Sequence, residues 1–233
     1  MVKERPILFS APMVCAILED RKTNTRRIID RLRGHRKISD FGKSNTEGYD
    51  FHFRDSMGVW NDLRESELLE LCPYGKVGDR LWVRETWCHA ADDYDRFKYN
   101  TEGNLDSSCC HFRADGYEVM HIDREETKAG LPRSPWCPSI HMPRWASRIT
   151  LEITGVRVEK LNEISEQDAI AEGIFKYTGD LGLYGHDPKG TPGPLVGGSA
   201  VEAFALLWES INGNGAWNKN PWVWVVKFKR VQQ

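Results

Sequence analysis

The sequence contains no apolar run long enough to span a membrane, and its N-terminus lacks a charged-then-apolar leader with a cleavage site. These absences predict a soluble, cytoplasmic protein without a membrane partner. Positive charge is not in excess either, because the formal net charge is -2. A globally basic surface for nucleic acid is therefore excluded, and only a local patch remains. Its candidate members are Arg21, Lys22, Arg26, Arg27, Arg31, Arg33, Arg36 and Lys37.

A regular cysteine framework is also absent. The six cysteines have no regular spacing and form no Cys-x-x-Cys pair, so reduced thiols are expected. Zinc is the alternative, because cysteines and histidines gather in Cys88-His89, Cys109-Cys110-His111, His121 and Cys137 to His141. Adjacent cysteines seldom ligate one metal well. We therefore expect neither a metal nor a cofactor.

The chain has no internal repeat, and its 233 residues with 40% hydrophobic content fit one domain. Apolar periodicity predicts strands at 6–10, 80–87, 148–159 and 221–228 and helices beginning at 11, 165 and 200. This order predicts an α+β fold, a small and mostly antiparallel β-barrel with flanking helices. Long loop insertions are expected at about 34–74, 88–147 and 175–198.

The octet Asp20 to Arg27 carries the most chemistry. On a helical turn, Lys22 would lie on the same side as Thr25, three residues later, with its amine close to the hydroxyl. Thr25 could then act as a nucleophile, provided that burial or the neighbouring Arg26 and Arg27 lowered the pKa of the lysine. The alternative is a solvated, basic helix end.

The order of several motifs resembles the ASCH superfamily, whose members have a PUA-like barrel fold. The family hallmark is glycine, any residue, lysine, four residues and arginine. Here Lys22 and Arg27 fit, and Asp20 replaces the glycine. The remaining motifs are Gly78 to Val83, Ile149 to Thr154, Trp82 to Trp87, Pro138 to Arg148 and the aromatic strand from Asn220 to Val225. Over nearly the whole chain they resemble the larger ASCH proteins of tailed bacteriophages and prophages, which implies the cytoplasm of a bacterial host.

The octet is also similar to that of the small N4-acetylcytidine amidohydrolases of the same superfamily. Their lysine, their threonine three residues later and their distant glutamate fall on Lys22, Thr25 and Glu152. The resemblance implies that these three groups meet at the barrel mouth and hydrolyse an amide without metal. The alternative is a structural ion pair between Lys22 and Glu152, with Thr25 capping a helix.

Binding of a nucleoside, RNA or single-stranded DNA at the barrel mouth is the first functional hypothesis. The residues expected to contact phosphate or a base are Arg26, Arg27, Trp82, Arg84, Glu85, His141, Arg144 and Arg148. The alternative for each tryptophan is a place in the core. Amide hydrolysis on an acylated nucleoside is the second hypothesis, and a phage protein that contacts a host protein through its insertions is the third.

Overall fold

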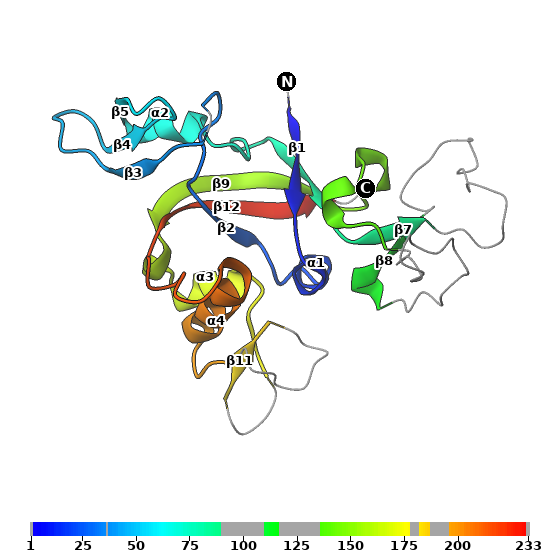
Figure 1. Cartoon of the computed structure of the whole chain (residues 1–233). Helices are drawn as coiled ribbons and strands as arrows, with labels where there is room; N and C mark the ends of the chain where they lie inside the picture. The colour runs from blue at the N-terminus through cyan, green and yellow to red at the C-terminus, as the bar shows by residue number, and fades with distance from the viewer. Residues whose placement is uncertain are drawn as a thin grey trace, which may run out of the picture.

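A computed structural model describes residues 2–35, 37–89, 110–116, 136–177, 182–186 and 196–231. A five-stranded sheet with strand order β1-β6-β9-β12-β2 forms its centre (Figure 1). β1 and β6 are parallel, and every other neighbouring pair in this sheet is antiparallel. The strands are β1 (Glu4–Leu8), β2 (Asn24–Ile28), β6 (Arg80–Arg84), β9 (Thr150–Lys160) and β12 (Trp222–Val231).

Four α-helices are present in the described part of the chain, and local sequence explains their ends. They are α1 (Ala11–Leu18), α2 (Glu65–Glu70), α3 (Glu166–Ala171) and α4 (Ala200–Asn212). Pro12 lies in the first turn of α1, where a backbone N–H has no helical partner. Ser165 and Ser199 cap α3 and α4, each accepting a hydrogen bond from the backbone N–H three residues later. The helices expected at 11, 165 and 200 are therefore confirmed.

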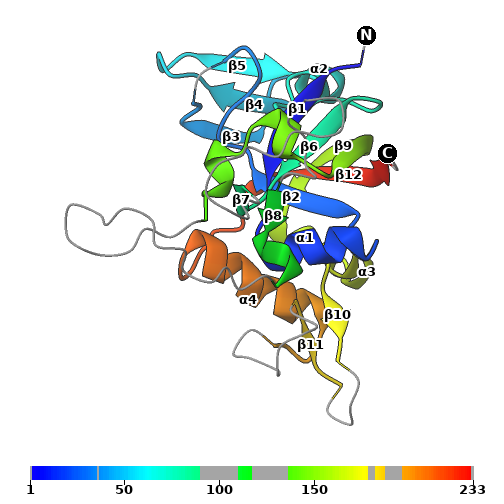
Figure 2. The same ribbon diagram turned by 90° about the vertical axis from the view of Figure 1, so that its right-hand side faces the viewer.

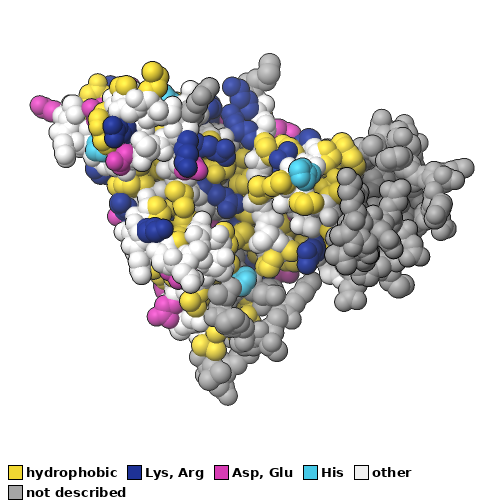
Figure 3. Space-filling model, viewed as in Figure 1, with side chains coloured by type: hydrophobic (Ala, Val, Ile, Leu, Met, Phe, Trp, Pro, Cys, Tyr) yellow, Lys and Arg dark blue, Asp and Glu magenta, His cyan; other side chains and the backbone are white. Residues whose placement is uncertain are grey.

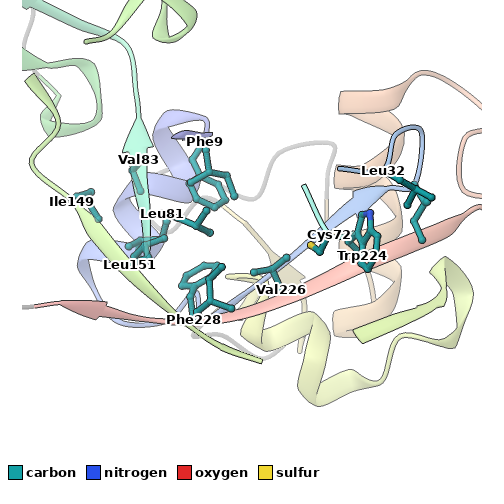
Figure 4. Packing of buried hydrophobic residues seen from close by; sticks show 14 of the residues in the cluster. Phe9, Leu32, Cys72, Leu81, Val83, Ile149, Leu151, Trp224, Val226 and Phe228 are labelled. Atoms are coloured by element: carbon teal, nitrogen blue, oxygen red, sulfur yellow. The ribbon is translucent and has the colours of Figure 1, made fainter. Parts of the chain in front are cut away.

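The last strand, β12, is buried on both faces. Trp224, Val226 and Phe228 pack into one core cluster with α1, among side chains of β6 and β9 (Figure 4). Val223 and Val225 point the other way, into a second cluster with α3 and α4. The helices α3 and α4 lie below the sheet in Figure 1. Alternate residues of one apolar run thus fill two cores, because successive strand side chains point to opposite faces.

The segments between these elements form peripheral units (Figure 2). The region expected as an insertion at 34–74 holds a three-stranded meander as well as α2, so three strands were missed there. The outer strands are β3 (Asp40–Lys43), β4 (Phe51–Arg54), β5 (Trp60–Leu63), β7 (Trp87–His89), β8 (Cys110–Phe112), β10 (Phe175–Lys176) and β11 (Tyr184–Gly185). The short 3-10 helices are η2 (Arg113–Asp115), η3 (Ser139–His141), η4 (Arg144–Ala146) and η5 (Leu161–Glu163).

The α+β class and the mostly antiparallel sheet agree with the sequence analysis, whereas a closed barrel is not seen. The sheet ends at β1 and β2, and no backbone pairing joins these two strands within the described residues. Arg27 connects them instead, because its Nη2 donates a hydrogen bond of 2.6 Å to the Leu8 carbonyl oxygen. A side chain thus bridges the two edges that a barrel would join by backbone hydrogen bonds.

No helix of the described residues is both long and apolar enough to cross a membrane.

Candidate functional site

The predicted helical turn at the octet is wrong, because residues 24–28 form strand β2. The extended backbone does not bring the Lys22 amine to Thr25. Lys22 is 2% exposed, and its Nζ lies 2.6 Å from Glu172 Oε2 and 2.8 Å from the Glu172 carbonyl oxygen. The amine of Lys22 is therefore held by Glu172, a residue that the sequence analysis did not predict at this site.

Arg26 extends this contact into a buried ion network. Its guanidinium donates to Glu172 Oε1 at 3.2 Å, to Glu159 Oε1 at 2.5 Å and to Asp168 Oδ2 at 3.0 Å. Arg157 binds Glu159 and Asp168 as well. We call these three cations and three carboxylates the ion network: Lys22, Arg26, Arg157, Glu159, Asp168 and Glu172. Its charges balance, as buried ions require.

The end of α3 places Glu172 against Lys22. Glu172 is the C-cap residue of the helix, and its backbone forms a β-bridge with Lys22. Gly173 follows with φ 98°, in the left-handed region that favours glycine. A Cβ on Gly173 would lie 3.0 Å from the Ala16 Cβ and 3.4 Å from the Lys22 Cβ. The glycine therefore ends the helix and also permits the close approach that brings the carboxylate to the lysine.

Electrostatics in the ion network follow from burial and from the paired charges. Burial lowers the pKa of the Lys22 ammonium below its ordinary value, against the opposing effect of Glu172. For Asp168, burial alone would raise the pKa, but Arg157 and Arg26 outweigh it and the pKa is lowered. The pKa of Arg26 is raised for the same reason, since Glu172 and Glu159 outweigh its burial.

A pocket of about 260 Å³ opens beside the ion network, between β2 and α4. Two members of the network, Arg26 and Glu172, line it together with the Thr25 hydroxyl side chain. Within the described residues, Thr25 makes no side-chain hydrogen bond, although it is 2% exposed. The other lining residues are Met13, Arg27, Ile28, Asp30, Arg31, Tyr74, Phe204, Leu207, Trp208, Ile211 and Asn212. One wall is thus apolar and aromatic, and the opposite wall is polar.

The expected meeting of Glu152 with Lys22 and Thr25 does not occur. Glu152 pairs in register with Lys229 of β12, and its Oε1 lies 3.3 Å from Lys229 Nζ. Thr25 pairs in register with Val226, three residues earlier on the same strand. Glu152 is therefore separated from the octet along the sheet. The carboxylate that contacts Lys22 is that of Glu172, not that of Glu152.

Six other predicted binding residues lie on or beside β6 and in the segment before β9, and none of them lines the pocket: Trp82, Arg84, Glu85, His141, Arg144 and Arg148. Arg84 stacks on Trp82, with its Cζ 4.7 Å from the ring centroid, and it pairs in register with Leu8, whose carbonyl oxygen accepts from Arg27. Arg144 Nε donates to Glu4 Oε2 at 3.0 Å, and His141 is exposed in η3. The structure therefore does not bring these six residues into the pocket of the octet, and their role in binding stays a prediction.

Arg148 and Glu85 belong to a separate ion cluster. Arg148 forms two hydrogen bonds to Glu85, at 3.0 and 3.1 Å, and two to Asp115, at 2.9 and 2.8 Å. Its Cζ lies 3.9 Å from the centroid of the Phe112 ring. Burial raises the pKa of the Glu85 carboxyl, because the opposing effect of Arg148 is smaller. We call Glu85, Asp115 and Arg148 the far cluster.

The cysteines and histidines considered for zinc are only partly described. Cys109 and His121 lie outside the described residues. Cys110 and His111 instead belong to β8, which pairs with β7. Among the described residues, no three His, Cys, Asp or Glu side chains are grouped so that they could hold a metal ion.

Asp20, at the position where the resemblance described above would place a glycine, has an unusual backbone conformation. Asp20 has φ 56°, again in the left-handed region, and it is one of two non-glycine residues with positive φ in the described chain. Aspartate is enriched there relative to most other residues. Arg230 Nη2 also lies 3.3 Å from Asp20 Oδ2. A residue tolerant of this conformation therefore occupies the position.

Sequence reasoning missed Glu172 and Trp208 as pocket residues. A signal for Glu172 was available, because a carboxylate at a helix C-terminus is unfavourable with the helix dipole and α3 has no basic residue in its last turn. Such a misplaced charge requires a cationic partner elsewhere. For Trp208 the helical periodicity predicted burial alone, and nothing in the sequence separated it from an ordinary core tryptophan.

Comparison with known proteins gives no assignment. No protein-family model, curated protein or solved structure matches this chain. A function can therefore be inferred only from the pocket and its residues.

Proposed function

We propose that this protein binds a nucleobase-containing ligand, a nucleoside or a single-stranded nucleic acid, in the pocket between β2 and α4. The observation that carries the proposal is Glu172, a carboxylate fixed by Lys22 and Arg26 on one wall, facing a pocket whose other wall is aromatic and apolar. Nucleobases combine an apolar face with a polar edge, and proteins recognise them by stacking and by edge hydrogen bonds. A volume of about 260 Å³ suits a single base with its sugar.

The free acceptor capacity of Glu172 favours cytosine over uracil. A carboxylate has about four lone-pair sites. Lys22 occupies one on Oε2 and Arg26 one on Oε1. The remaining sites can accept the exocyclic amino group of cytosine, as carboxylates do in base recognition. Uracil offers a carbonyl oxygen at that position, which the carboxylate would repel.

Titration calorimetry with cytidine and uridine tests this proposal. Glu172→Gln keeps the shape and replaces one acceptor by a donor, so cytidine affinity should fall about tenfold or more. Asp168→Asn is the matched control, because Asp168 belongs to the same ion network but does not line the pocket. Equal losses in the two variants, or equal affinity of the unchanged protein for cytidine and uridine, would contradict the role of Glu172. Failure of cytidine, uridine and a short single strand to bind would overturn the proposed function itself.

A second candidate function is removal of an acyl group from N4-acetylcytidine or a similar nucleoside. It is favoured by Thr25, whose hydroxyl side chain shares the pocket with Glu172 and lacks a hydrogen-bond partner among the described residues. In this reaction the Thr25 oxygen attacks the acyl carbon, the C–N bond breaks, and the departing amine takes the proton that the hydroxyl gave up. Water then hydrolyses the acyl-threonine ester and releases the acid.

Acetate release from N4-acetylcytidine distinguishes catalysis from binding. Thr25→Val keeps the shape of the side chain and removes the hydroxyl, so it should abolish turnover and leave cytidine binding nearly unchanged. Thr25→Ser should retain turnover, because the nucleophile remains. Turnover that survives in Thr25→Val would sink the nucleophile assignment. Absence of turnover in the unchanged protein, together with cytidine binding, would leave the binding function as the sole proposal.

A further inference from the structure

At the mouth of the pocket the arginines are not paired with carboxylates, in contrast to the cations of the ion network. Arg27 is half-buried and Arg31 is exposed, and both line the pocket. Within the described residues, neither arginine forms an ion pair with a carboxylate, whereas Lys22, Arg26 and Arg157 all do. Asp30 also lines the mouth. Two cations and one anion leave a net positive charge there.

Basic side chains also gather elsewhere on the surface. Figure 3 shows Lys and Arg side chains gathered along the seam between the β3–β5 meander and the rest of the molecule. Arg27 is oriented by its hydrogen bond to the Leu8 carbonyl oxygen, and its Cζ lies 5.4 Å from the centroid of the Phe9 ring. These contacts leave further N–H donors of its guanidinium available. Arginine pairs of this kind commonly recognise phosphate.

Trp208 supplies an aromatic ring to the pocket wall. It is 6% exposed and lines the pocket from α4, whereas its indole nitrogen is buried and has no hydrogen-bond partner in the described chain. Because nucleobases stack on aromatic side chains, the ring of Trp208 offers a surface for the face of a bound base.

We infer that the ligand is a nucleobase carrying a phosphate, bound with the base beside Trp208 and the phosphate at Arg27 and Arg31. This inference rests on the proposed function and adds the substrate class and the orientation. The base lies between Glu172 and α4, where it contacts the ring of Trp208. The phosphate can belong to a free nucleotide or to a single-stranded chain, since the two offer the same chemistry.

Calorimetry with cytidine, cytidine monophosphate and a short oligocytidine tests the inference. The monophosphate should bind about tenfold more tightly than cytidine, because charge-assisted hydrogen bonds to phosphate are added. Tighter binding of the oligocytidine than of the monophosphate would identify a chain as the source of the phosphate, and equal binding would identify a free nucleotide. Equal affinity for cytidine and its monophosphate would overturn the inference while the proposed function stands. No binding of any of the three would instead refute the proposed function.

Two pairs of variants test the orientation. Arg31→Met should lower affinity for the monophosphate and leave cytidine unchanged. Arg33→Met is its control, because Arg33 pairs with Glu70 outside the pocket. Trp208→Phe should weaken both ligands about threefold to tenfold. Its control is Trp224→Phe, which loses the same atoms from another buried, unpaired indole that does not line the pocket.

The pattern of losses separates recognition from folding. A loss of cytidine affinity in Trp224→Phe equal to that in Trp208→Phe would assign the effect to packing and overturn the role of the Trp208 ring. Equal effects of Arg31→Met and Arg33→Met on the monophosphate would overturn the phosphate site. Urea unfolding of all four variants reports their stability independently of ligand.

Discussion

The ion network and the far cluster both place carboxylates against arginine, but they differ in how many cations surround each carboxylate. In the ion network, three cations face three carboxylates, and the pKa of the partly buried Asp168 is lowered because Arg157 and Arg26 outweigh its burial. In the far cluster a single arginine is shared by the buried Glu85 and the exposed Asp115, and burial raises the pKa of Glu85. Both the number of cations and the depth of burial therefore decide the direction in which a carboxyl pKa moves.

The two regions also differ in what they join. The ion network links β2, β9 and α3 beside the pocket, so its geometry determines the pocket wall. The far cluster links Glu85, directly after β6, to Asp115 of η2 through Arg148, two residues before β9. Together with the Arg148 contact to the Phe112 ring, it attaches the β7–β8 hairpin to the sheet. The first region is therefore a candidate for ligand recognition and the second for structural support.

The largest expected effect comes from removing the central arginine of each region. Arg26→Met leaves three carboxylates with two cations, and it should cost about 3–5 kcal/mol of unfolding free energy. Arg148→Met should cost less, about 1–3 kcal/mol, because the Glu85 carboxyl already has a raised pKa and can take up a proton. Urea unfolding measures both. Equal losses would show that the two regions do not differ as described.

The next largest effect is the loss of stability when a glycine with positive φ in each region is replaced by alanine. Gly116, beside the far cluster, has φ 78° and no neighbour within 4 Å of an added Cβ, so Gly116→Ala should cost about 1–2 kcal/mol from backbone strain. Gly173→Ala adds a close contact with Ala16 and Lys22 to the same backbone strain. It should therefore lower the free energy of unfolding by about 1–3 kcal/mol more than Gly116→Ala does. Thermal or urea unfolding gives the difference. We also expect cytidine binding to weaken only in Gly173→Ala, and unchanged binding there would contradict the positioning role of this glycine.

The smallest effect is the dependence of stability on pH, and its sign should differ between the regions. The folded pKa of Asp168 lies below its ordinary value of 3.8, so its contribution to stability is present above that pH and is lost as the pH falls through the folded pKa. The folded pKa of Glu85 lies above its ordinary value of 4.5, so its contribution is present below that pH and is lost as the pH rises through the folded pKa.

Unfolding of two variants between pH 3 and pH 7 measures this difference. Relative to the unchanged protein, Asp168→Asn should be most destabilised at neutral pH and less so in acid. Glu85→Gln should show the reverse, gaining relative stability as the pH rises from 4.5. For each variant, the difference in unfolding free energy from the unchanged protein is plotted against pH. The same slope for both variants would contradict the described difference between the two regions.

Much of the secondary structure could be predicted from the sequence because its signals are local. The alternation of apolar residues in β9 and β12, the serine caps of α3 and α4 and the glycine after α3 each depend on a few neighbouring positions. The octet was wrongly predicted as helical because spacing within it suits a helical turn, while pairing with β12 stabilises a strand. The β3–β5 meander was missed because its short strands lie among Gly, Ser, Asn and Asp residues.

Local sequence signals account for the α+β class and for the positions of the main helices and most central strands, and they mark Lys22, Thr25, Arg26 and Arg27 as candidate site residues. Which carboxylate meets the lysine depends on the tertiary fold. Glu172 lies 150 positions from Lys22 along the chain, and their contact depends on the antiparallel sheet, the end of α3 and the space left by Gly173. Local periodicity carries no information about such a contact, because the cost of burying these charges is balanced by residues from separate elements. For the same reason Glu172, and not Glu152, contacts Lys22. The predicted binding residues are likewise divided between those that line the pocket and those that do not, among them Glu85 and Arg148 of the far cluster.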